Sequence, residues 1–242
     1  GHMNLQLEGA KKIFYVSGSV AITGGILSLF YYAYLMPLHV DEAGWWFHYT
    51  NRSYQHRFIF NPLNPNHTLS IYLAKISLQI FGNTGIGLRL PVIVFGTLSA
   101  GVFYLFVRKV TRSGVTGVVA TMLLFLNPFF MHYSHELRGY PVYFFFLVCC
   151  YLCFMRLLEK GNRFSTWAML FMLFMACYVA NLAAPIFFSI FLATIWIFVI
   201  LKRIIPIGDR VPGFENIHIG SLFAYSSIAA SFFAFIMFYV DR

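Results

Sequence analysis

Long apolar runs, separated by short polar segments, dominate the hydrophobic pattern of this chain. Seven of them approach the roughly 20 apolar residues that an α-helix needs to cross a bilayer. Because the bilayer core offers no water to the backbone, such runs are expected to be helices. The pattern therefore predicts an all-α polytopic membrane protein with about seven transmembrane helices. The predicted helices are Ile13–Leu35, Leu88–Val107, Val115–Tyr133, Tyr140–Leu158, Phe164–Ala180, Leu182–Leu201 and Ile217–Val240.

The segment 38–87, between the first two runs, is expected to form an outer loop with one or two juxtamembrane helices. Asp41–Arg57 predicts a helix lying on the membrane, because Asp41 suits an N-cap and the nearby tryptophans suit the interface. A second such helix is expected over Leu69–Phe81, which is apolar but too short to span. The apolar stripe of this second helix consists of Leu69, Tyr72, Ile76 and Ile80.

The positions of Lys and Arg predict an orientation for these helices. If the N-terminus is cytoplasmic and Leu69–Phe81 does not span, the cytoplasmic side holds eleven of the 17 Lys and Arg residues. If that segment spans the membrane, every later loop moves to the opposite side, and the cytoplasmic excess of Lys and Arg is lost. The positive-inside rule therefore favours the first arrangement, which places the C-terminus outside. The eleven are Lys11, Lys12, Arg108, Lys109, Arg112, Arg156, Lys160, Arg163, Lys202, Arg203 and Arg210.

Composition agrees with an integral membrane domain and excludes some other classes. Of the 242 residues, 60% are hydrophobic and 10% are charged. The net charge of +9 is explained by basic cytoplasmic loops, and no basic-aromatic groove for nucleic acid is apparent. The four cysteines lie inside apolar runs and are interpreted as small buried hydrophobes. Gly1-His2-Met3 resembles a tag remnant, which leaves 4–242 as a single transmembrane module.

Two acidic sites fall on the same predicted side of the membrane. Asp41-Glu42 follows the first apolar run, and Glu136-Leu137-Arg138 follows the third. Ionisable groups beside membrane spans carry a desolvation penalty, so they are candidates for function. An outward-facing guanidinium also needs a counter-ion, and a lipid phosphate is a natural one. These observations predict an exterior pocket that handles a sugar carried on a lipid phosphate. The predicted outward basic residues there are Arg52, Arg57, Lys75, Arg89 and Arg138.

Several short motifs follow Asp41-Glu42 in a fixed order. They are Asn66–Tyr72, Phe81-Gly82 with Leu88–Pro91, Asn127-Pro128, and Ser134–Tyr140. In this order they resemble the GT-C glycosyltransferases that use polyprenyl-phosphate sugars, especially the protein O-mannosyltransferases and the lipid A aminoarabinose transferase. Thr68 stands where that family usually has proline after the histidine. The family also continues with further spans and often a soluble outer domain.

The resemblance implies a GT-C-like fold and an inverting transfer of a sugar from a polyprenyl-phosphate donor to an acceptor on the outer side. It implies Asp41 as the base that activates the acceptor, with Glu42 and Glu136 as further catalytic carboxylates. Arg138 or Arg89 would stabilise the charge on the leaving phosphate. A divalent metal bridging the three carboxylates is an alternative. The other predicted substrate-binding residues are His67, Lys75, Arg57 and Tyr140.

Simpler interpretations and other functions stay open at this point. Asp41-Glu42 also fits a helix cap, Glu136 with Arg138 a structural salt bridge, and His67 an interfacial histidine; His132 and His135 also fit a metal pair. The rival function is a non-catalytic lipid-phosphate-binding subunit, or a degenerate paralogue, that needs a partner domain or subunit. A transporter or scramblase ranks last, because the spans lack central charges and repeats. The expected location is a bacterial or archaeal plasma membrane, with the active face periplasmic or extracellular. The sequence does not identify the sugar, the acceptor or a cofactor. No nucleic acid is expected as a partner.

Overall fold

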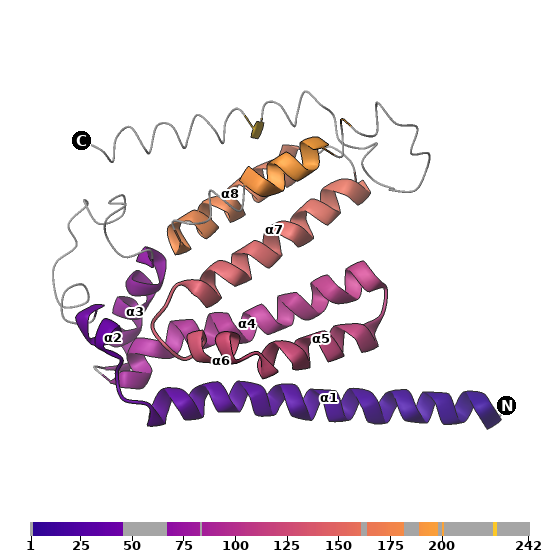
Figure 1. Ribbon diagram of the computed structural model, residues 1–242, viewed down its shortest axis with the longest axis horizontal. Coiled ribbons are helices and arrows are strands. Elements are labelled where there is room, and N and C mark those ends of the chain that lie inside the picture. Colours follow the sequence, from indigo (N-terminus) through magenta and orange to yellow (C-terminus); the bar gives the residue numbers. More distant parts are fainter. Residues whose placement is uncertain are drawn as a thin grey trace. The chain divides into compact units, whose positions relative to one another are not determined.

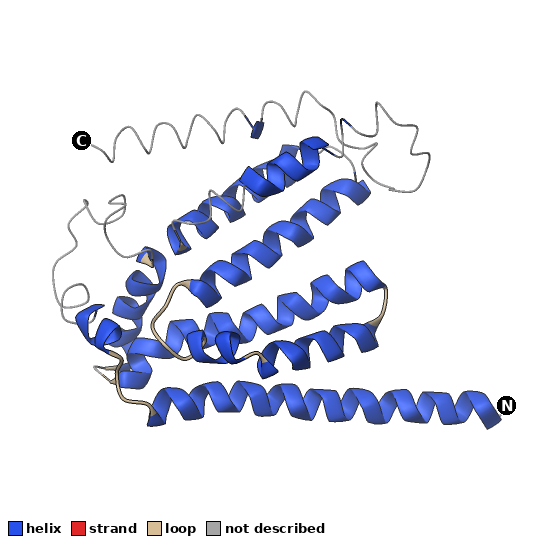
Figure 2. Ribbon diagram, in the orientation of Figure 1, coloured by secondary structure: helices blue, strands red, loops and turns tan. Residues whose placement is uncertain are grey.

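The structure, a computed structural model, describes residues 2–45, 67–82, 84–160, 164–181, 189–197, 200 and 225–226. Within these ranges the secondary structure is helical and includes no strand, as Figure 2 shows. The prediction of an all-α protein is confirmed. The labelled helices (Figure 1) are α1 (His2–Leu35), α2 (Val40–Trp45), α3 (Thr68–Phe81), α4 (Gly85–Thr111), α5 (Gly114–Leu126), α6 (Pro128–Tyr133), α7 (Tyr140–Lys160) and α8 (Phe164–Ala180).

Three of the described helices are long and apolar enough to cross a membrane. They are Glu8–Leu35 of α1, Gly85–Thr111 of α4 and Tyr140–Glu159 of α7, with 28, 27 and 20 residues. The shorter apolar helices are α3, α5 and α8. Helix α8 has the predicted bounds, whereas the predicted helices 182–201 and 217–240 lie largely outside the described residues. Length and composition thus confirm the membrane character of the chain.

The prediction of one continuous helix over Val115–Tyr133 is wrong, because the helix breaks at Asn127. Pro128 has no N–H to donate and clashes with a preceding helical turn, so it ends α5 and begins α6. Asn127 adopts an extended conformation (φ −74°, ψ 116°), and its side chain accepts hydrogen bonds from Phe129 N and Phe130 N at 2.9 and 3.2 Å. This cap starts the short helix that carries the chain towards residues 134–139.

Helix α3 turns the apolar stripe predicted for it outwards. Its buried residues are Ser70, Ile71, Ala74 and Ser77. Tyr72, Ile76 and Ile80 are instead exposed. Three of the four buried residues are small, whereas the exposed apolar residues are large, which is the arrangement expected of a helix with one face towards lipid.

By contacts between Cα atoms the chain divides into two compact units, residues 1–54 with 69–148 and residues 55–68 with 149–242. In the first unit α4 packs against α5, α1 packs against both, and α6 follows α5 (Figure 1). The core between these helices consists of Leu29 and Ala33 of α1, Ile93 and Ala100 of α4, and Phe125 of α5. The prediction of a single module over 4–242 stays a prediction.

Two glycines let α1 approach α5 closely. A Cβ atom on Gly18 would lie 2.3 Å from Val118 Cγ1, and one on Gly25 would lie 2.6 Å from Phe125 Cγ. Both distances are shorter than any real Cβ contact, so only glycine fits at either position without rearrangement. Small residues at helix interfaces allow such close packing inside membranes.

The described part of the second unit consists of residues 67–68, part of α7, α8 and a few later residues. Its buried side chains include Cys153, Phe154, Trp167 and Cys177. Cys153 Sγ donates to Thr166 O at 3.6 Å, and the rings of Trp167 and Tyr225 lie 4.8 Å apart. All four cysteines are free thiols.

Candidate functional site

A buried ion pair ties the chain after α1 to the first turns of α4. Arg89 Nε donates to Glu42 Oε1 at 2.9 Å, and Arg89 Nη2 donates to Glu42 Oε2 at 2.5 Å. This is the bidentate geometry in which a planar guanidinium donates two parallel hydrogen bonds to a carboxylate. The Arg89 side chain is 1% exposed and that of Glu42 is 0% exposed. A charge buried this deeply is tolerated only when it is paired and hydrogen-bonded throughout.

Every donor of Arg89 has a partner. Besides Glu42, the guanidinium donates to the carbonyl oxygens of Ala33, Met36 and Pro37 at 2.9, 2.8 and 2.9 Å. These carbonyls belong to the end of α1 and the residues that follow it, where helical backbone lacks its own donors. Since an arginine has five N–H groups and all five are used, Arg89 acts as a cap for α1 and has no donor left for a substrate.

Glu42 is equally saturated. Its Oε1 also accepts from Leu137 N at 2.7 Å, and its Oε2 accepts from His39 N at 3.0 Å. Burial by itself would raise the pKa of Glu42, but the hydrogen bonds from Arg89, Leu137 and His39, with the charge of Arg89, outweigh it and lower that pKa. Glu42 is therefore an anion at neutral pH. We call Glu42, Arg89 and the Leu137 amide the buried anchor.

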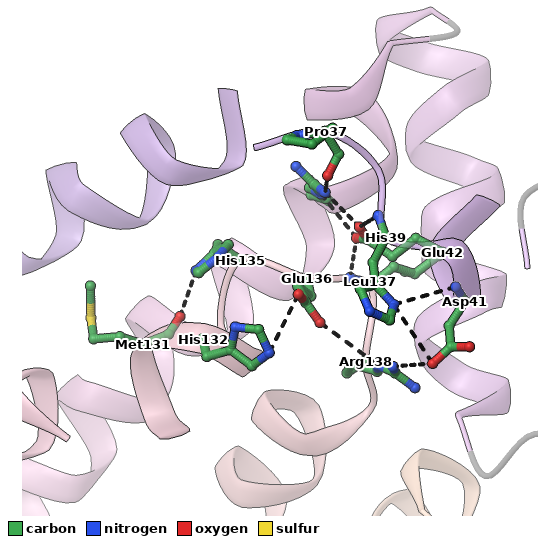
Figure 3. A network of polar contacts seen from close by, with 11 residues as sticks. Pro37, His39, Asp41, Glu42, Met131, His132, His135, Glu136, Leu137 and Arg138 are labelled. Carbon is green, nitrogen blue, oxygen red and sulfur yellow. Dashed lines mark hydrogen bonds and ion pairs between the residues drawn. The ribbon is translucent and has the colours of Figure 1, made fainter. Parts of the chain in front are cut away.

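The start of α2 differs from the prediction that Asp41 is its N-cap. The helix begins at Val40, so His39 is the cap and Asp41 lies in the first turn. His39 Nδ1 accepts from Asp41 N at 3.4 Å, while Glu42 reaches back to His39 N. The bond from His39 N to Glu42 is that of a capping box, in which the third helical residue accepts from the N-cap amide. It turns the side chains of Asp41 and Glu42 to different partners (Figure 3).

The buried anchor also fixes the loop that carries the second acidic site. The Leu137 side chain is buried against Ala74, Leu88 and Val92, while its backbone N–H reaches Glu42. With Leu137 held at both its side chain and its amide, its neighbours Glu136 and Arg138 are also held in place. Arg138 donates to Asp41 Oδ2 across 97 residues of sequence (Figure 3).

Ionisable groups continue from this contact along an edge that is partly open to solvent. Arg138 Nε lies 3.9 Å from Glu136 Oε2, and His132 Nε2 lies 3.4 Å from Glu136 Oε1. At the other end, His39 Nδ1 lies 3.8 Å from Asp41 Oδ2. We call His39, Asp41, Arg138, Glu136 and His132 the open network; Figure 3 shows them in this order.

The members of the open network differ in exposure. The side chains of Asp41, His39 and His132 are 50%, 53% and 54% exposed, whereas those of Arg138 and Glu136 are 19% and 10% exposed. Arg138 Nε is buried and makes no hydrogen bond to a described residue. The network therefore places an accessible carboxylate next to a guanidinium that is 19% exposed. Such an arrangement can accept a proton and bind an anion.

His135 belongs to the same loop but points elsewhere. Its Nδ1 lies 2.7 Å from Met131 O, and since a carbonyl can only accept, Nδ1 carries the proton. Its ring stacks on Tyr32 of α1, with centroids 5.6 Å apart. Burial lowers the pKa of His135 and outweighs the opposing effects of the Met131 bond and of Glu136. The imidazole is therefore a neutral packing residue between α1 and the loop.

The structure brings together five of the predicted site residues, namely Asp41, Glu42, Arg89, Glu136 and Arg138. His67 precedes α3 and is buried, while Lys75 lies within α3 and is half-buried. Tyr140 is the first residue of α7, and its ring lies 4.7 Å from that of Tyr133. Arg57 lies outside the described residues, as does most of the predicted helix Asp41–Arg57.

Residue types carry no signal for the backbone groups that complete the site. The amide of Leu137 and the carbonyls at the end of α1 exist at every position of a chain, so only the fold selects them. The spacing of His39 and Glu42 matches that of a capping box, but histidine is not a preferred N-cap residue, so the sequence favoured Asp41 instead.

A metal-binding role for the three carboxylates has no support in the geometry. In the described part of the chain, no group of three or more His, Cys, Asp or Glu side chains is placed to hold a metal ion. The carboxylate of Glu42 faces Arg89, whereas that of Asp41 faces Arg138.

Comparison with known proteins adds one finding. Residues 67–208, more than half of the chain, match the family described as dolichyl-phosphate-mannose-protein mannosyltransferase. The matched range includes Arg89, Glu136 and Arg138, and begins after Asp41 and Glu42. No curated protein and no solved structure matches the chain.

Proposed function

The chain belongs to the dolichyl-phosphate-mannose-protein mannosyltransferase family, and we propose that it forms the catalytic membrane module of an inverting glycosyltransferase. The donor is a polyprenyl-phosphate sugar, and the acceptor is a hydroxyl group of a protein, as the family description suggests. The single observation that carries this proposal is the contact of Asp41 with Arg138. It places a half-exposed carboxylate beside a guanidinium, where a base and a phosphate-binding cation would act together.

In this mechanism Asp41 takes the proton from the acceptor hydroxyl as its oxygen attacks the anomeric carbon of the donor sugar. The bond between that carbon and the phosphate oxygen breaks, and the polyprenyl phosphate leaves with the electron pair. Negative charge thus builds on the phosphate, where Arg138 stabilises it. Attack from the side opposite the leaving group inverts the configuration at the anomeric carbon. A positioned general base of this kind contributes about 10²- to 10⁴-fold to the rate.

Glu42 and Arg89 take positioning roles in this proposal, because their donors and acceptors are used within the protein. They hold the start of α2 and the amide of Leu137, and so set the distance between Asp41 and Arg138. Glu136 lies between Arg138 and His132 and keeps the guanidinium oriented. His67 and Lys75, beside and on α3, and Arg57 stay candidates for contacts with the donor phosphate.

We place this edge on the outer side of the membrane, with the N-terminus cytoplasmic. The support is the excess of Lys and Arg on the opposite side, which includes Arg108 and Lys109 in the last turn of α4. Asp41 and Arg138 would then meet their substrates in the periplasm or outside the cell.

The test is sugar transfer by the chain in lipid nanodiscs, with a short-chain polyprenyl-phosphate mannose as donor and a peptide rich in Ser and Thr as acceptor. Asp41→Asn keeps the size of the side chain and its hydrogen bonding but removes the base, so we expect transfer to fall at least about 100-fold. Binding of the donor, measured by calorimetry, should persist.

Two outcomes of this experiment contradict the proposal. Transfer by Asp41→Asn at the wild-type rate would remove Asp41 from the mechanism. A wild-type chain that binds the donor but transfers nothing would favour the rival function, a lipid-phosphate-binding subunit that needs a partner for chemistry.

A further inference from the structure

A pair of tyrosines lies immediately beside the open network. The rings of Tyr133, at the end of α6, and Tyr140, at the start of α7, have centroids 4.7 Å apart and planes inclined at 53°. Tyr140 is 41% exposed and Tyr133 is half-buried. The two rings therefore form an open corner rather than a closed stack, and part of their aromatic surface stays accessible.

Contacts join this aromatic corner to the charged groups. The ring of His132 lies 5.1 Å from that of Tyr133, and His132 Nε2 in turn approaches Glu136. Tyr140 follows Arg138 by two residues, so their Cα atoms are at most about 7 Å apart. Aromatic faces and hydrogen-bonding side chains of both signs thus meet over a short distance.

This combination has the chemistry of a carbohydrate subsite. One face of a hexose is rich in C–H groups, which suit the negative face of an aromatic ring. The rim of the sugar carries hydroxyls, which suit carboxylates and imidazoles as hydrogen-bonding partners. A lipid tail would instead favour an apolar surface without charged neighbours.

We infer that Tyr133 and Tyr140 bind the hexose ring of the donor, with His132 beside them as a partner for its hydroxyls. The inference rests on the proposed function, in which Arg138 holds the donor phosphate. Because the sugar is bonded directly to that phosphate, the ring must lie next to Arg138, where Tyr140 is placed. The acceptor is held in this mechanism through its hydroxyl group at Asp41, so we assign the corner that follows Arg138 to the donor.

The experiment compares two ligands in each variant. Short-chain polyprenyl-phosphate mannose and the same polyprenyl phosphate without the sugar are titrated into the chain in nanodiscs. Tyr133→Leu and Tyr140→Leu should weaken binding of the mannosylated ligand roughly three- to tenfold, the range of an aromatic contact. Binding of the sugar-free ligand should stay unchanged. The readout is the ratio of the two affinities. Partial misfolding would lower both affinities equally and would leave their ratio unchanged.

Two control variants sharpen the comparison. Tyr140→Phe keeps the ring and should keep the wild-type ratio. Tyr31→Leu removes a tyrosine that is 60% exposed on α1, and should also keep it. If instead Tyr31→Leu changes the ratio as much as Tyr140→Leu does, the effect is a general loss of interfacial aromatics and the inference is wrong.

The remaining outcomes separate this inference from the proposed function. Equal weakening of both ligands by Tyr133→Leu and Tyr140→Leu, or no weakening, overturns the sugar subsite alone, provided that the wild-type chain binds and transfers mannose. A wild-type chain that binds neither ligand overturns the proposed function and this inference together.

Discussion

Asp41 and Glu42 are chain neighbours with opposite environments. Glu42 is fully buried against Arg89, whereas half of the Asp41 side chain is exposed next to Arg138. The same chemical group therefore serves two purposes at adjacent positions: one carboxylate fixes the backbone, and the other faces the medium. This division predicts that the two residues respond differently to the same substitution.

Glu42→Gln should destabilise the protein, and Asp41→Asn should not. Removing the charge of Glu42 leaves Arg89 buried without a counter-ion, which costs about 3–5 kcal/mol. The Asp41 pair is partly solvated, so its loss should change stability by less than about 1 kcal/mol. Reversible unfolding in mixed micelles, followed by circular dichroism, gives both values. Equal losses for the two variants would contradict the distinction between anchor and network.

Neutral His135 predicts a pH dependence of stability. Its pKa in the folded protein is lowered, so the unfolded chain binds the proton more readily. The contribution of His135 is complete above the ordinary histidine pKa of about 6.5 and is lost as pH falls below it towards the folded-state value. Melting temperatures between pH 8 and pH 5 should show this loss. It should disappear in His135→Phe but persist in His132→Phe, since His132 is exposed.

At the scale of helices, the close contact between α1 and α5 allows a matched comparison. A Cβ on Gly25 would meet Phe125 at 2.6 Å, whereas a Cβ on Gly24 would meet nothing within 4 Å. Gly25→Ala should therefore cost about 1–3 kcal/mol through overpacking. Gly24→Ala should be neutral or stabilising, because alanine is the better helix former. Thermal unfolding of the two variants measures the difference. A neutral Gly25→Ala would contradict the prediction and would mean that α5 shifts away at little cost.

Helix positions were largely predictable from the sequence, and the exceptions have physical reasons. The hydrophobic run located α8 to the residue and α3 within one residue. It failed at Asn127-Pro128, where apolar composition continues but a missing N–H and a side-chain cap interrupt the helix. Hydropathy depends only on composition. A helix break of this kind has to be inferred from the proline and the residue before it.

For the candidate site, the proximity of the two acidic segments was predictable, but the pairing of their side chains was not. The predicted topology brought Asp41, Glu42, Glu136 and Arg138 to one place, and the structure does the same. It could not tell that Glu42 pairs with Arg89 while Asp41 pairs with Arg138, because that choice depends on which face of α2 meets the Leu137 amide. Tertiary contacts determine which charged groups pair, and the residue types alone do not indicate that choice.

For the whole molecule, the proposed orientation predicts which residues a membrane-impermeant thiol reagent can reach. With the native cysteines replaced, Ala43→Cys near Asp41 and His132→Cys near Glu136 should both be labelled from outside. Thr111→Cys, at the far end of α4, should react only after the membrane is permeabilised. All three parent residues are exposed in the structure. Labelling of positions 43 and 132 from opposite sides would exclude a shared exterior site.

The buried anchor also has a consequence for biogenesis. The amide that completes the coordination of Glu42 belongs to Leu137, which lies 95 residues downstream. At the usual synthesis rate of about 5–20 residues per second, the ribosome adds it roughly 5–19 s after Glu42. Throughout that interval Glu42 lacks one of its hydrogen-bond partners. Completion of the buried anchor must therefore wait until the segment that contains Leu137 has been made, however early Glu42 is made.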